Sequence, residues 1–271
     1  MYSGSTLTPF SGRILGAHQK LDRVARKNLN KIIENKSGFP SSNKILHFEG
    51  KKGPDAIKRK SPAKDEPWHY YSPFDDKDSQ LLDLIDDHYK KLVNELKSNN
   101  QERIAFEAAW LAHAITDGLT PAHHYPYEQK VEELWEGSKD QRTTLGKKWF
   151  PPADTKRGRI KKTWKYLGPK GLMSTHGLFE FGIAMIIAPL SMKESVPTQE
   201  DIVNARKIGH IEAFKHSARE IAVLDMYERF MKKGWSPKLV VDVRNKLGPT
   251  IAKTITLVWF LAISEAKNIK V

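Results

Sequence analysis

Residues 110–123 read WLAHAITDGLTPAH, which places two histidines and an aspartate in the pattern H-x3-D-x5-H. Positions four apart share one face of a helix, so His113 and Asp117 are predicted to point at the same place. The glycine and the proline that follow Asp117 end the helix and turn the chain, which brings His123 back toward that place. Imidazole and carboxylate groups are zinc ligands, and a zinc site open to water supports hydrolysis. The stretch therefore predicts a metal site at the end of a helix.

The composition of the chain limits which residue types can hold a metal ion and which partners are favoured. With 271 residues, the chain is long enough for one large domain or two small ones. It has no cysteine, which excludes disulfides, thiolate nucleophiles and cysteine ligands, so a metal must be held by His, Asp and Glu. A balance of 45 basic against 32 acidic residues gives a net charge of +13. This charge favours anionic partners: nucleic acid, phosphorylated substrates or an acidic membrane surface.

The sequence shows neither the pattern of a secretory signal peptide nor that of a membrane span. The N-terminus lacks the basic and apolar regions of a secretory signal peptide, so we expect a cytoplasmic protein. The apolar runs 177–190 and 255–263 are too short to cross a bilayer, and the first contains Glu180. We therefore predict no transmembrane segment.

The apolar spacing along the chain predicts a helical protein. Helical patterns cover residues 13–36, 79–98, 101–117, 172–188, 199–233 and 236–267. Two long segments lack such a pattern over most of their length: 39–78, which holds five prolines, and 128–171, where one short helix precedes a stretch rich in Pro, Gly and Lys. No run of alternating strands is present. We predict an all-α fold, a single multi-helix domain over 1–271 with two long functional loops.

Five further residues are candidate ligands. Asp55 follows a Gly-Pro pair and His69 lies in the sequence PWHYY, both in the proline-rich segment. His18 lies in the apolar stripe of the first helix, where a lone histidine is more often a buried, hydrogen-bonded side chain. His176 and Glu180 are four apart, again on one helix face. Glu180 is the only charge in its apolar run, where a carboxylate without a partner is costly, and a metal ion would provide that partner.

The same sequence offers an internal control. His216 and Glu220 have the same spacing, but they lie opposite the apolar stripe of their helix and are flanked by Lys215 and Arg219. We therefore expect this second pair on a solvated face. Four other histidines are expected to have no metal role, although one of them adjoins His123: His47, His88, His124 and His210.

Together these motifs resemble the superfamily of bacterial zinc-dependent phospholipases C and single-strand-specific fungal and plant nucleases. The resemblance rests on the H-x3-D-x5-H segment with a proline two residues before its last histidine, on the spacing from Asp55 to His69, and on the Trp-His-Tyr-Tyr context of His69. It extends as ordered motifs from about His18 to Glu180, and the C-terminal helices match only in character. It implies a helical fold that binds two or three zinc ions.

The resemblance also implies how the ligands are shared among three zinc sites. The first site would be formed by Asp55, His69, His113 and Asp117. The second would be formed by His123, His176 and Glu180. The third would share Asp117 and add His18. In the family, the third ion also takes the amino group and carbonyl of an N-terminal tryptophan, whereas this chain begins Met1-Tyr2 and its first tryptophan is Trp68. That site is therefore incomplete, uses Met1 itself, or requires processing of the N-terminus.

The activity implied is hydrolysis of a phosphodiester. The two ions bridged by Asp117 are expected to hold the attacking hydroxide, and the ion of the second site is expected to bind the phosphate and stabilise the leaving alkoxide. Asp55 and Asp117 are the predicted catalytic residues. Asp55 acts primarily as a ligand, although its equivalent in the family has also been considered as a base.

The sequence does not decide which class of phosphodiester is the substrate. The segment 139–170 is a basic insertion with eleven basic and two acidic residues, interleaved with four aromatic side chains. This composition suits single-stranded nucleic acid, peripheral contact with an anionic membrane, or a solvated insertion whose aromatics cap the core. The Gly-Pro-Asp loop and the motif layout favour a phospholipase C. The alternatives are a single-strand-preferring nuclease and a basic metal-binding protein of the same fold that has lost turnover.

Overall fold

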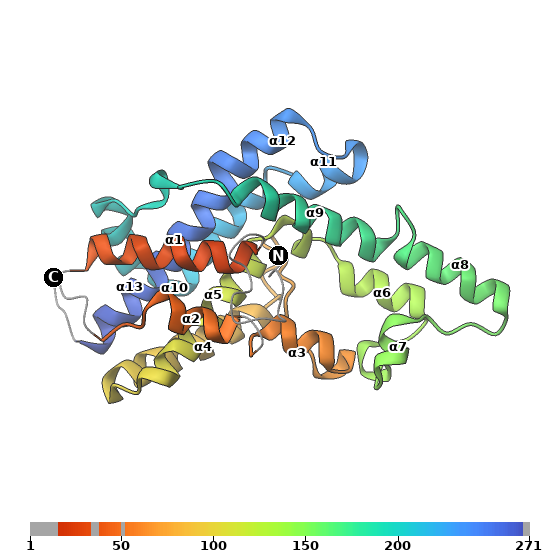
Figure 1. Ribbon diagram of the computed structural model, residues 1–271, viewed down its shortest axis with the longest axis horizontal. Helices are drawn as coiled ribbons and strands as arrows, with labels where there is room; N and C mark the ends of the chain where they lie inside the picture. The colour runs from red at the N-terminus through yellow and green to blue at the C-terminus, as the bar shows by residue number, and fades with distance from the viewer. Residues whose placement is uncertain (1–15, 34–37, 50–51, 268–271) are drawn as a thin grey trace.

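The computed structural model describes residues 16–33, 38–49 and 52–267, which form helices and no strand (Figure 1). In chain order the α-helices are α1 (Ala17–Ile32), α2 (Ser42–Glu49), α3 (Pro54–Lys60), α4 (Gln80–Ser98), α5 (Gln101–Gly118), α6 (Tyr127–Trp135), α7 (Leu145–Trp149), α8 (Lys156–Leu167), α9 (Leu172–Ile187), α10 (Gln199–Ala222), α11 (Met226–Lys233), α12 (Pro237–Asp242) and α13 (Gly248–Ala266). Between them lie the 3-10 turns η1 (Ala63–Asp65), η2 (Pro121–His123), η3 (Lys139–Gln141) and η4 (Lys193–Ser195) and a π-helical turn, η5 (Val243–Leu247). The prediction of an all-α protein is confirmed.

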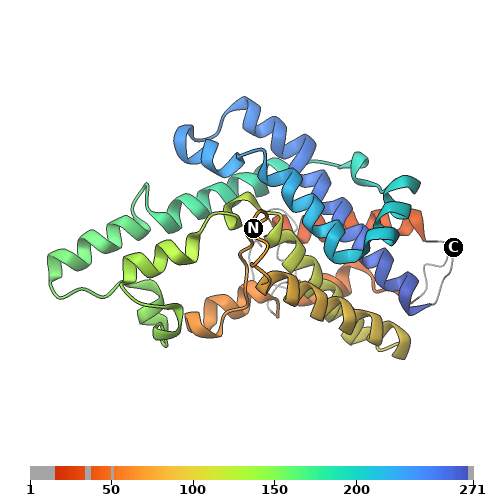
Figure 2. The ribbon, with the colours of Figure 1, turned by 180° about the vertical axis from the view of Figure 1, so that it is seen from behind.

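Two central helices, α5 and α13, form the middle of the core, and α1, α2, α4 and α10 pack around them (Figures 1 and 2). Both are buried over most of their circumference, as expected for helices that are apolar on every side. The fully buried Trp259 of α13 donates a hydrogen bond from its indole nitrogen to the carbonyl oxygen of Ala108 in α5, at 3.1 Å. This hydrogen bond joins the middle of α5 to α13.

The continuous helical run Pro237–Ala266 is long and apolar enough to cross a bilayer. However, 89% of its most apolar window is buried inside the protein. A core helix has the same length and composition, so this run is weak evidence for a membrane span.

Helices α6, α7 and α8 extend away from the core, and α9 leads back to it (Figures 1 and 2). They are held by a small apolar cluster of their own, formed by Tyr127, Val131, Trp135 and Tyr166. The indole of Trp135 donates a hydrogen bond to the carbonyl oxygen of Lys147, at 2.6 Å, which ties α6 to α7. The basic insertion is therefore a folded unit rather than a loose loop.

The prediction of two long loops is wrong. Helices α2 and α3 lie in the first segment, and α7 and α8 lie in the second, after the one short helix predicted there, which is α6. Prolines do not prevent this, because Pro54 occupies the first turn of α3, where its missing N–H costs nothing. Helices this short owe their stability to packing rather than to intrinsic propensity, as the buried Ile45 and Phe48 of α2 illustrate.

The predicted helix boundaries differ most clearly at one point. The helix predicted over 199–233 ends at Ala222 and restarts at Met226, because Asp225 adopts a left-handed backbone conformation with φ 47°. The helix predicted over 236–267 is found as the continuous run Pro237–Ala266, in which η5 is a π-helical turn. The predicted ends of the first helix, at 13–15 and 34–36, lie outside the described residues.

Candidate metal centre

The last turn of α5 presents His113 and Asp117, and Gly118 ends that helix in a crowded position. A Cβ atom at Gly118 would lie 2.5 Å from Leu81 and 2.6 Å from Phe214, so only glycine allows this packing. The chain then turns into η2. The end of α5 is therefore anchored in the core at the point where the ligands begin.

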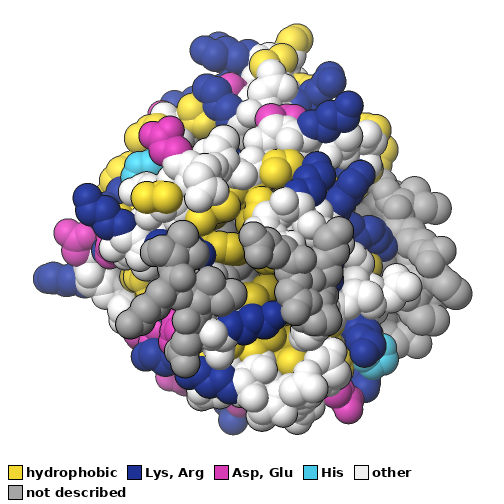
Figure 3. Space-filling view, turned by 90° about the vertical axis from the view of Figure 1, so that its left-hand side faces the viewer, with side chains coloured by type: hydrophobic (Ala, Val, Ile, Leu, Met, Phe, Trp, Pro, Cys, Tyr) yellow, Lys and Arg dark blue, Asp and Glu magenta, His cyan; other side chains and the backbone are white. Residues whose placement is uncertain are grey.

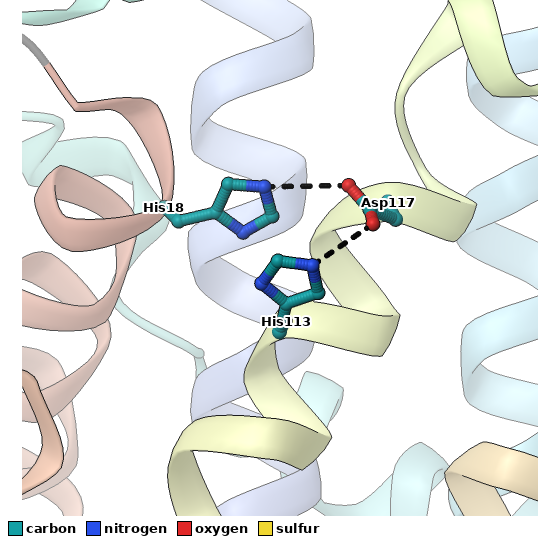
Figure 4. Close-up of side chains that lie close together, drawn as sticks. All are labelled: His18, His113 and Asp117. Carbon is teal, nitrogen blue, oxygen red and sulfur yellow. Dashed lines mark ion pairs between the residues drawn. The ribbon is translucent and has the colours of Figure 1, made fainter. Parts of the chain in front are cut away.

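The carboxylate of Asp117 is the centre of the site, and four imidazoles surround it. Its Oδ2 atom lies 2.5 Å from His69 Nδ1 and 3.1 Å from His113 Nε2. Its Oδ1 atom lies 3.3 Å from His18 Nε2 and 3.6 Å from His123 Nδ1. In Figure 4, His18 from α1 and His113 from α5 point at the two different oxygens of this carboxylate. Asp117 thus has the position expected of a bridging ligand.

A second group joins η2 to α9. One oxygen of Glu180, Oε1, lies 2.9 Å from both His123 Nε2 and His176 Nε2, and the two imidazole rings stack with their centroids 5.1 Å apart. The Nδ1 atom of His123 donates a hydrogen bond to the carbonyl oxygen of His69, at 2.9 Å. In a neutral imidazole this leaves the Nε2 lone pair facing the carboxylate. A metal ion between these two electron-rich atoms would satisfy both of them.

A third group brings the partly exposed Asp55 of α3 toward His113, with 3.8 Å between Oδ1 and Nε2. In each of three groups, the candidate ligand atoms lie within 4.8 Å of one another: His18, His113 and Asp117; Asp55, His69 and His113; and His123, His176 and Glu180. All eight predicted ligands belong to at least one group. They come from four α-helices, from η2 and from the segment before α4.

The protonation states at the site suit a metal ion. Burial, together with the nearby Lys58, lowers the pKa of His69 to about 3, and burial also lowers the pKa of His123 to about 4. For the carboxyl group of Asp55, burial opposes ionisation, but His113 and other neighbours lower its pKa to about 2. Neutral imidazoles and ionised carboxylates are the forms that bind metals. The buried His69 Nε2 has no hydrogen-bond partner among the described residues, which leaves it available as a ligand atom.

The buried carboxylate of Glu49, the last residue of α2, supports this site and was not predicted. Its Oε1 atom lies 2.9 Å from His113 Nδ1 and 3.7 Å from His18 Nδ1. Although burial opposes protonation of His113, Glu49 and Asp117 raise its pKa well above the ordinary value. The site thus favours positive charge here, which a metal ion would also supply. In the sequence, Glu49 directly follows the apolar Phe48, which could have indicated a buried carboxylate. The helix that contains both was not predicted, because the five prolines of the segment 39–78 favoured a loop.

A cavity of about 300 Å³ lies between the ligand groups and the basic insertion. Asp55, His123, His176 and Glu180 form part of its wall. The insertion and α6 contribute most of the remaining wall, including the aromatic side chains Tyr127, Trp149 and Tyr166. The ligands and the insertion therefore share one binding space.

Four basic side chains also line this cavity: Lys58, Arg59, Arg142 and Lys148. Lys148 pairs with Glu66, at 2.5 Å, and Arg142 forms an ion pair with Glu128. Lys58 is half-buried and lies over the ring of Tyr70, 5.9 Å from its centroid. Burial disfavours its charge, but Tyr70, Asp55 and other neighbours outweigh this effect and raise its pKa. Lys58 is therefore a charged group in the cavity wall.

The remaining histidines lie apart from these three groups. The side chains of His216 and Glu220 are 69% and 58% exposed, as expected for a solvated face. His88 is buried and bonds to Glu107, at 2.7 Å. The other three make separate contacts, with Phe48 for His47, with the carbonyl of Gly118 for His124 and with Asp86 for His210.

Comparison with known proteins gives no relative: no family model, no curated protein and no solved structure matches this chain. The resemblance therefore rests on the motifs, and the fold type that it implies stays a prediction. The contribution expected from Met1 to a third ion lies outside the described residues.

Proposed function

We propose that this protein is a zinc-dependent phosphodiester hydrolase of the phospholipase C type, with two or three zinc ions. The proposal depends on one observation above all. Side chains from six separate segments, between residues 18 and 180, converge on one place with their potential ligand atoms within 4.8 Å in each group. Three such groups around a shared carboxylate are typical of a multinuclear metal site rather than of an isolated buried histidine.

The side chains have distinct expected roles. Zinc, when bound, lowers the pKa of water toward about 7 and neutralises charge on a phosphate. Asp117 would be a ligand common to more than one ion, and Glu49 would orient His113 by accepting a hydrogen bond from the ring nitrogen that faces away from Asp117. Asp55 borders the cavity as an ionised carboxylate whose side chain is 24% exposed, so its main expected role is that of a metal ligand on the open side of the site, because a carboxylate with so low a pKa is a weak base.

The size of the cavity favours a head group as the bound portion of the substrate. A volume of about 300 Å³ is at the lower end of the range for small-molecule sites, roughly 300–1,000 Å³. It fits a phosphorylated head group, while two acyl chains would stay outside. Lys58 and its basic neighbours would bind the phosphate, and the tyrosine rings could accept a quaternary ammonium by cation–π attraction.

A nuclease is the second candidate, because Trp149 and Tyr166 of the basic insertion line the same cavity. Aromatic rings beside basic side chains bind single-stranded nucleic acid by stacking and charge. The residues of this cavity wall are therefore compatible with a phospholipid head group and with single-stranded nucleic acid.

One assay separates these candidates. The purified protein is incubated with phosphatidylcholine and, in parallel, with single-stranded DNA, with and without a chelator. We expect release of a phosphorylated head group that the chelator abolishes and added zinc restores. Metal-dependent cleavage of DNA alone would favour the nuclease. Two or three bound zinc ions without cleavage of either substrate would favour a metal-binding protein that has lost turnover.

A further inference from the structure

Helix α8 carries an apolar face that is largely exposed to solvent. Ile160 is 70% exposed, Trp164 67% and Leu167 42%. Their spacing of four and three residues places them on one side of the helix. Among the described residues, eight of the thirteen exposed large hydrophobic side chains lie between residues 145 and 185. Such a concentration of exposed apolar side chains marks an interaction surface.

The charges around this face have one sign. Six of the twelve residues of α8 are basic and none is acidic. Helical geometry places Lys156, Arg157 and Lys161 beside the apolar face. Of the six basic residues, only Lys162 forms an ion pair with a described residue, Glu136. At the opposite end of the molecule, in contrast, Lys and Arg side chains are interspersed with Asp and Glu (Figure 3).

The other side of α8 faces the interior. Tyr166 is 5% exposed, packs edge-on against Trp135 and lines the cavity beside the metal ligands. The core of the insertion is therefore built without Ile160, Trp164 and Leu167. One helix connects the cavity wall to an outward apolar and basic face.

We propose that α8 docks this protein onto an anionic phospholipid bilayer. Ile160, Trp164 and Leu167 would enter the boundary between head groups and acyl chains, and the flanking Lys and Arg side chains would contact anionic head groups. A bilayer fits better than a nucleic acid, because two of the three apolar residues are aliphatic and cannot stack on bases. Docking itself does not depend on the proposed function. Only the further step, that this bilayer supplies the phospholipid substrate, rests on it.

The test is sedimentation of the full-length protein with phosphatidylcholine vesicles that contain or lack phosphatidylserine. We expect binding to the anionic vesicles that weakens as salt is added. The double substitution Ile160→Ser and Trp164→Ser should reduce binding at least about tenfold, since it removes most of the apolar area that enters the lipid. The matched control replaces two exposed apolar residues elsewhere, Val223→Ser and Val241→Ser, and should bind as the unaltered protein does.

A second pair of variants tests the charges. Arg157→Glu with Lys161→Glu should weaken binding to the anionic vesicles, whereas Lys97→Glu with Lys207→Glu, at exposed positions on other helices, should not. Equal binding by the α8 variants and their controls would overturn the proposal. The proposal would also be overturned if the unaltered protein bound neither type of vesicle but bound a single-stranded oligonucleotide, and if substitution of Ile160 and Trp164 abolished that binding.

Failure of docking and failure of the proposed function are distinguishable. The Ile160 and Trp164 variant should hydrolyse a water-soluble phosphodiester at the unaltered rate, because neither side chain lines the cavity. A protein that binds anionic vesicles through α8 but cleaves no phosphodiester would support docking and contradict the hydrolase.

Discussion

Two His–Glu pairs in this protein have the same spacing of four residues on a helix but differ in their burial and in their neighbours. His176 and Glu180 on α9 have side chains that are 7% and 13% exposed, and a third residue, His123, contacts the same carboxylate oxygen at 2.9 Å. His216 and Glu220 on α10 are largely exposed and lie 3.6 Å apart. The pair on α10 can satisfy its polar atoms with water, whereas the pair on α9 must find partners within the protein. Burial and convergence, rather than spacing, distinguish a candidate metal site.

The largest effect is expected at the residue that joins the ligand groups. Asp117→Asn keeps the size of the side chain but removes its negative charge and one acceptor oxygen. It should abolish metal-dependent hydrolysis and lower the zinc content, measured by atomic absorption, by more than one ion per chain. Full activity in this variant would contradict the bridged site.

The two pairs can be compared directly by the same substitution. Glu180→Gln should remove about one zinc ion per chain and lower kcat/KM more than about 100-fold, because loss of an outer-shell partner alone costs 10–100-fold. Glu220→Gln should leave both quantities unchanged. If the two variants behave alike, the distinction between the pairs fails.

A smaller effect is expected from Glu49, which contacts a predicted ligand rather than the ion. Glu49→Gln weakens the hold on the ring of His113 and should lower zinc affinity by about 10–100-fold, measured by competition with a chelator. Saturating zinc should restore most of the activity. A purely structural role would instead lower the free energy of unfolding and leave zinc affinity unchanged.

The smallest effect concerns the pH dependence of stability in the metal-free protein. The pKa of His123 is about 4 in the folded protein, against about 6.5 when exposed. Between these values the unfolded chain binds a proton that the folded protein does not, so the free energy of unfolding falls as the pH falls from 6.5 toward 4. One such group contributes about 1.4 kcal/mol per pH unit.

Urea denaturation of the chelator-treated protein at several pH values measures this slope. The substitution His123→Gln should flatten it, whereas His216→Gln, on the exposed pair, should keep the slope of the unaltered protein. Equal slopes in all three proteins would contradict the buried, neutral state of His123.

The sequence allowed prediction of the features that depend on local pattern. The apolar stripes predicted most of the longer helices, and the spacing from His113 to His123 predicted that these side chains would meet. The apolar residues on either side of Glu180 in the chain were enough to distinguish it from Glu220.

The features that depend on distant contacts were not predicted. Helices α2 and α3 are too short to show a clear period and are stabilised by burial against the core. Glu49 becomes a partner of His113 only because α2 packs on α5, 64 residues further along the chain. The cavity, likewise, exists only because the insertion folds back toward the ligands.

The separate apolar cluster that holds α6, α7 and α8 together has an evolutionary consequence. Because Val131, Trp135 and Tyr166 belong to an apolar cluster separate from the main core, the outer part of this unit could diverge in length and charge while the candidate ligands stayed constant. Under the proposed docking, changes on the outer face of this unit would alter the lipid surface that the protein binds and would leave the candidate ligands in place.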